Sequence, residues 1–78
     1  MNEWLSRRAD ALAEAAQLDR NTLELESRDV ATLLDLAGDA AHASGARTNA
    51  PLLCYLLGLS RGAGKGLEEL AEIVRSTS

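Results

Sequence analysis

The chain has 78 residues and a net charge of −4 at pH 7, with one Trp, one Tyr and no Phe. This length excludes a second domain or a doubly wound sheet, and no apolar run approaches the roughly 20 residues that span a bilayer. The acidic balance argues against binding to nucleic acid, which requires clustered Lys and Arg.

Alanine and leucine dominate the composition and β-branched residues are scarce, so the sequence predicts an all-α fold. The first helix is expected over residues 3–17, with Asn2 as its N-cap. Spacings of four, three and four place on one face of this helix Leu5, Ala9, Leu12 and Ala16. Residues 18–26 are predicted to form a loop.

The second helix is expected over residues 28–44, with Ser27 as its N-cap and Asp29 in its first turn. Gly45 follows it at the position where a left-handed residue commonly ends a helix. The helical spacing assigns to its apolar stripe Val30, Leu33, Leu34, Ala37 and Ala41.

The third helix is expected over residues 51–61, because proline is favoured in the first turn of a helix and Asn49 can cap that start. The run LLCYLLGLS, residues 52–60, is apolar on every side. Such a helix lies at the centre of a core or is covered by something else. The sequence therefore predicts that other helices, or a partner, cover this segment.

A glycine-rich connection, RGAGKG at residues 61–66, precedes a fourth helix over residues 67–75. The connection lacks the spacing of a phosphate-binding loop and follows a helix instead of a strand, so we interpret it as a flexible connector. The apolar stripe of the last helix comprises Leu67, Leu70, Ala71 and Val74. Together the segments predict a compact bundle of about four short helices, a single domain over residues 1–78.

One polar stripe of the second helix holds Asp35, Asp39 and His42, at positions i, i+4 and i+7. Carboxylates and an imidazole on one face could bind a small molecule or a metal ion. Three groups on one helix rarely complete a metal shell, and no second cluster of ligands exists to close it. A solvated face, with Asp39 paired to His42, is the favoured interpretation, and a ligand or partner face is the alternative.

Cys54, the only cysteine, lies within an apolar run, which is typical of a structural thiol. A single cysteine excludes an internal disulfide, and the N-terminal residues lack an apolar signal segment, so we expect a cytoplasmic protein. No nucleophile, base and orienting group can be assembled. The sequence predicts a protein that is not an enzyme and that holds neither a metal nor a cofactor.

A core built without large aromatic anchors in so short a chain has difficulty covering its apolar surface. A second copy of the chain, as a homodimer, or another protein would cover the remainder. The expected apolar interface consists of Trp4, Leu53, Tyr55 and Leu56.

Several segments carry a family resemblance: NEWL at 2–5, LLDLAGDAAH at 33–42, APLL at 50–53 and LLGL at 56–59. In this order they resemble the DUF6457 family, small actinobacterial proteins of unknown function. Its members occur free-standing or as a C-terminal extension of molybdenum cofactor guanylyltransferase. The resemblance implies an accessory role near the biosynthesis of the molybdenum cofactor, with an enzyme of that pathway as partner. It implies no catalytic residues.

Overall fold

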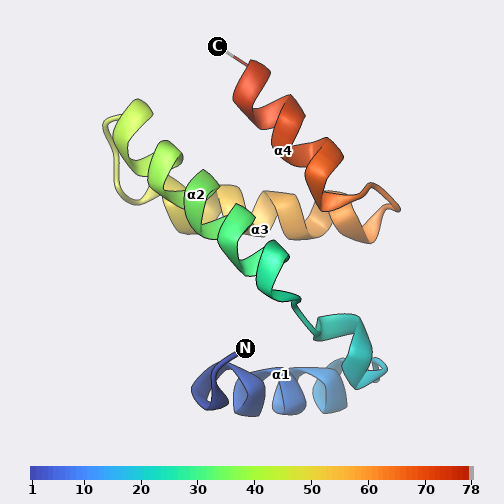
Figure 1. Ribbon diagram of the computed structural model, residues 1–78. Helices are drawn as coiled ribbons and strands as arrows, with labels where there is room; N and C mark the ends of the chain where they lie inside the picture. The colour runs from blue at the N-terminus through green and yellow to red at the C-terminus, as the bar shows by residue number, and fades with distance from the viewer. Residues whose placement is uncertain (78) are drawn as a thin grey trace. The chain divides into compact units, whose positions relative to one another are not determined.

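The computed structural model describes residues 1–77, and these residues form four α-helices, one short 3-10 helix and no strand. The all-α fold with four helices is therefore confirmed (Figure 1). The chain divides into two compact units, one over Met1–Val30 and a second from Ala31 on. The expected single domain stays a prediction.

The first unit begins with α1, Glu3–Ala16, whose start is fixed as expected by a side-chain cap. The Asn2 side chain accepts a hydrogen bond from the Leu5 N–H at 2.9 Å, which satisfies one of the free N–H groups of the first turn. The helix ends at Gln17, which adopts the left-handed conformation with φ 57°. The Gln17 N–H and the Leu18 N–H donate to carbonyl groups of the last turn, and the chain can then turn away.

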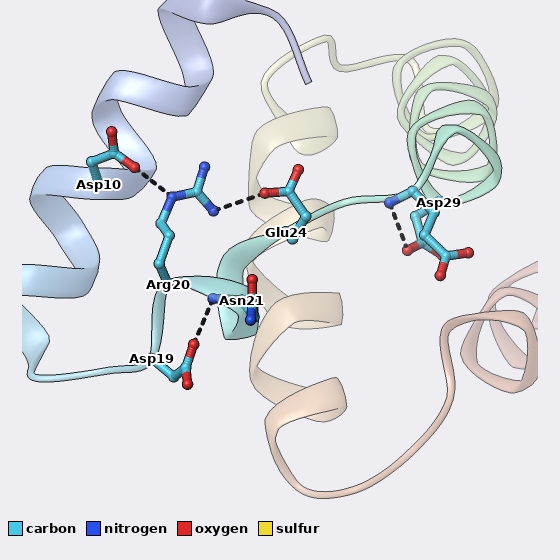
Figure 2. Close-up of polar contacts among 7 residues, drawn as sticks. Asp10, Asp19, Arg20, Asn21, Glu24 and Asp29 are labelled. Carbon is cyan, nitrogen blue, oxygen red and sulfur yellow. Dashed lines mark hydrogen bonds and ion pairs between the residues drawn. The ribbon is translucent and has the colours of Figure 1, made fainter.

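The segment after α1 is not a simple loop, because Arg20–Leu23 form the 3-10 helix η1. Asp19 caps it by accepting a hydrogen bond from the Asn21 N–H at 2.9 Å. Figure 2 shows the Arg20 guanidinium between Asp10 on α1 and Glu24. The Arg20 nitrogens lie 2.6 Å from the Asp10 carboxylate and 3.1 Å from the Glu24 carboxylate. Sequence reasoning missed η1 because its cap and its ion pairs do not follow an apolar period.

The apolar stripe of α1 differs from the expected one. The buried residues are Ala9 and Ala13, whereas Leu5 and Leu12 are exposed. Ala13 stands one turn after Ala9, so the buried row follows the i, i+4 line instead of passing through Leu12. The two alanines lack long side chains, and this allows a close approach of neighbouring backbone.

Helix α2, Ser27–Ala43, begins in the first unit and continues into the second. Ser27 is its first residue and not its cap, contrary to expectation. The Glu26 carbonyl accepts from the Val30 N–H at 3.0 Å, and the Glu26 N–H donates to the Asp29 carboxylate at 3.3 Å. The acidic side chain in the first turn thus supplies the cap that the Ser27 hydroxyl was expected to give. At the other end, Gly45 has φ 74°, as predicted.

Helices α3, Asn49–Gly62, and α4, Leu67–Ser76, complete the second unit with the rest of α2. The predicted cap Asn49 lies inside α3, and Thr48 stands at the cap position without a side-chain hydrogen bond. Pro51 is in the first turn, as expected. Gly64, with φ 102°, lies in the connection between α3 and α4 and allows the chain to reverse there.

Three helices of the second unit share one small core, whose fully or nearly buried members are Leu36, Leu57, Leu70 and Ala71. Leu33, Leu53 and Val74 pack against it. The stripe predicted for α4 is confirmed. The stripe predicted for α2 is wrong in part, because Leu36 has no exposed surface whereas Leu34 is 68% exposed.

A hydrogen bond also links α2 to α4 across this core. The Thr32 hydroxyl donates to the Glu68 carboxylate at 3.1 Å. The interaction is exposed and contributes little to stability, but it marks where the first turn of α4 lies against α2. The core therefore has α2, α3 and α4 on its sides, and only one face of α3 is turned toward it.

Candidate functional site

The outward side of α3 carries large apolar side chains that no other part of the unit covers. Relative exposure is between 57% and 68% for each of four residues, Leu52, Tyr55, Leu56 and Leu59. Their spacing of i, i+3, i+4 and i+7 places them in one row on the helix surface. These four residues are called the α3 outer face. It lies opposite the buried Leu57, so α3 is neither central nor enclosed within this unit.

The expected interface residues fall in three different places. Tyr55 and Leu56 belong to the α3 outer face, together with Leu52 and Leu59, which sequence reasoning missed as interface residues. Leu53 is partly buried and packs on the core. Trp4 belongs to the first unit, where it is 62% exposed and the Arg8 guanidinium stacks 4.0 Å from the centre of its ring.

The helical period groups residues 52, 55, 56 and 59 into one row, by the same rule that identified the other stripes. It does not determine which row of this helix faces the core. In a run that is apolar on every side, the inward face is selected by the neighbours Leu36 and Leu70, which lie far away in sequence.

The three residues of the polar stripe of α2, Asp35, Asp39 and His42, are all exposed. Among the interactions of the described residues, no hydrogen bond or ion pair joins Asp39 to His42, so the expected pairing is not present. Within residues 1–77 no group of three or more His, Cys, Asp or Glu side chains is placed to hold a metal ion.

Asp39 and His42 do line one open cavity of about 590 Å³ in the second unit, whereas Asp35 does not. The cavity lies between the C-terminal ends of α2 and α4, and its apolar residues include Leu53 and Val74. Arg75, exposed in the last turn of α4, stands at its rim. This cavity is called the C-terminal groove. Its volume lies within the range of small-molecule sites, and it combines an apolar surface with a few polar groups.

Among residues 1–77, no hydrogen bond joins His42 to a hydroxyl or thiol group, the contact by which a histidine activates a nucleophile. Cys54 is a free, partly buried thiol on α3. No helix of the described residues is long and apolar enough to cross a membrane.

Comparison with known families gives one match that covers residues 1–78. It is the family described as "Domain of unknown function (DUF6457)". Searches of curated proteins and of solved structures returned no match.

Proposed function

Since the chain belongs to the DUF6457 family of unknown function, we propose that it is a non-enzymatic accessory domain that binds a protein through the α3 outer face. The supporting observation is the row of four exposed apolar side chains on one helix. Together they expose an area on the order of 400 Å², which is comparable to the largest apolar patch of a typical monomer, and such a patch is often functional.

The make-up of this face also suits a protein partner. Tyr55 combines a large apolar ring with a polar hydroxyl, and tyrosine is enriched where binding energy is concentrated in interfaces. Three leucines surround it and would exclude water from the contact. A partner that covers the row removes apolar surface from water, which is the main favourable term in protein association.

The proposed partner is an enzyme of molybdenum cofactor biosynthesis, and a second copy of the chain is the alternative occupant. The choice of enzyme rests on the family resemblance, whose members also occur joined to molybdenum cofactor guanylyltransferase. The free thiol of Cys54 fits a reducing compartment, so we place this association in the cytoplasm.

The test is calorimetric titration of the full chain with purified molybdenum cofactor guanylyltransferase from the same organism. Leu56→Ser should weaken binding by about tenfold or more, the loss expected for a residue at the centre of an interface. Leu34→Ser is the matched control, because Leu34 is also more than half exposed but lies on α2. It should leave binding unchanged.

Two results would contradict the proposed function. One is the absence of binding heat together with a monomer at all concentrations in sedimentation equilibrium. The other is an equal loss of binding in Leu56→Ser and Leu34→Ser, which would show that the α3 outer face has no special role.

A second candidate function is the binding of a small organic molecule in the C-terminal groove. It is favoured by the position of Asp39, His42 and Arg75 around an apolar surface. Titration with Zn²⁺, Ni²⁺ and pterin nucleotides, followed by calorimetry and by the His42 ring resonances, decides it. The absence of both binding heat and a shift of those resonances would rule out this candidate function.

A further inference from the structure

The C-terminal groove has opposite charges on its two walls. Asp39 lines it from α2 and Arg75 lines it from α4, and both residues are exposed. Within residues 1–77 neither side chain makes a hydrogen bond or an ion pair, although a carboxylate and a guanidinium line the same cavity. The groove therefore keeps one anion and one cation apart, and both are available to a ligand.

The surface between the two charges is apolar. Leu53 of α3 and Val74 of α4 are partly buried and pack against the core, and Ala40 of α2 also lines the cavity. His42 lies one turn after Asp39 on the same wall, and an imidazole can donate or accept a hydrogen bond. An apolar surface with a few polar groups at its edge is the usual composition of a small-molecule site.

The pair of opposite charges restricts the class of ligand. A ligand with only negative charge is attracted by Arg75 but repelled by Asp39, and a ligand with only positive charge meets the reverse. An uncharged apolar ligand displaces water from both charges and offers neither of them a partner, which is unfavourable. A zwitterion suits both walls, because its ammonium and its carboxylate each meet an opposite charge.

We propose that the C-terminal groove binds a small zwitterion with an apolar body, of the class of apolar dipeptides. The ammonium group approaches Asp39, the carboxylate approaches Arg75, and the apolar side chains lie on Leu53 and Val74. This inference rests on the second candidate function, small-molecule binding in this groove, and specifies its ligand class. It is independent of partner binding at the α3 outer face, whose four residues do not line this cavity.

The experiment uses the full chain and four forms of leucyl-leucine, at about pH 7, where a free α-amino group is mostly protonated. One form has both ends free, one is acetylated at the amino end, one is amidated at the carboxyl end, and one carries both blocks. Binding is followed by the methyl resonances of Leu53 and Val74. The free dipeptide should bind about fivefold more tightly than either singly blocked form, because each block removes one ion pair. Added salt should reduce this difference.

Conservative variants connect each end of the dipeptide with one residue. Asp39→Asn should remove the preference for a free amino end and keep the preference for a free carboxylate, and Arg75→Gln should do the reverse. Asp35→Asn and Arg28→Gln are the matched controls, because both residues are exposed and neither lines the cavity. They should leave the order of the four forms unchanged. All four positions are exposed, so the fold tolerates these changes.

The outcomes separate this inference from the functions proposed above. Equal binding of all four forms, with shifts at Leu53 and Val74, would overturn the zwitterion and leave the groove as a small-molecule site. The absence of any shift with each form at about 10 mM would overturn the inference, and the second candidate function would then depend on the titration with pterin nucleotides. Shifts concentrated at Leu52 and Leu56 would place the dipeptide on the α3 outer face and contradict the inference.

Discussion

Leu36 and Leu34 lie two residues apart on α2, and their replacement by Ala tests which side of this helix faces the core. Leu36 has no exposed surface, and its side chain contributes to the only core cluster of the described second unit. Leu→Ala at such a site lowers the free energy of unfolding by about 3–5 kcal/mol, because the transfer free energy of the deleted side-chain atoms is lost and a cavity remains. Leu34 is 68% exposed, so Leu34→Ala should change stability by about 0.5 kcal/mol or less.

The size of the chain makes this difference easy to observe. A single core in a protein of this length supplies about 3–5 kcal/mol in total, so Leu36→Ala should be largely unfolded at 25 °C. The assay is urea denaturation followed by circular dichroism at 222 nm. Leu36→Met keeps most of the volume and should cost less than about 1.5 kcal/mol, which gives a measurable transition. Equal destabilisation by Leu34→Ala and Leu36→Ala, or a larger effect at Leu34, would refute this orientation of α2.

Further changes test the local features of the fold by the same denaturation assay. Asn2→Ala should lower the free energy of unfolding by about 0.5–2 kcal/mol, because the Leu5 N–H loses its acceptor. An unchanged urea midpoint would contradict the role of Asn2 as the cap. Gly58→Ala should stabilise by up to about 1 kcal/mol, because Gly58 is helical and an added Cβ meets no atom within 4 Å. Gly64→Ala should destabilise by about 1 kcal/mol because φ is 102°, and the opposite sign at either glycine would refute the reasoning. Arg20→Met should lower the free energy of unfolding by about 1 kcal/mol or less at low salt, since its partners Asp10 and Glu24 are mostly exposed; a loss that persists in 1 M salt would indicate packing of the Arg20 side chain instead.

The sequence was sufficient to predict the four helices, because helix-forming residues, capping signals and apolar periods agree over most of the chain. It was less informative where two leucines stand side by side. In the LLDL run at residues 33–36, the helical period admits a stripe through Leu34 or one through Leu36. Only the positions of Leu57 and Leu70, on other helices, select Leu36. The orientation of a helix is thus a tertiary property.

For the candidate site, too, the sequence was sufficient for one part and the tertiary packing was needed for the rest. An all-apolar third helix was evident from the sequence, and so was the need for something to cover it. Its division into an inward side around Leu57 and an outward side around Leu56 required the neighbouring helices. The C-terminal groove was not predictable, because it joins Asp39 and His42 to Arg75 across two helix ends. Sequence spacing grouped Asp35 with them, although Asp35 does not line that cavity.

The most direct test of the docking face is methyl NMR of the full chain, labelled at leucine, during titration with molybdenum cofactor guanylyltransferase from the same organism. Binding at the α3 outer face should shift the methyl resonances of Leu52, Leu56 and Leu59 and leave those of Leu36 nearly unchanged. Shifts concentrated at Leu53 and at the His42 ring would place the partner at the C-terminal groove. That result, or the absence of any shift at saturating partner, would contradict the assignment of the α3 outer face as the docking surface.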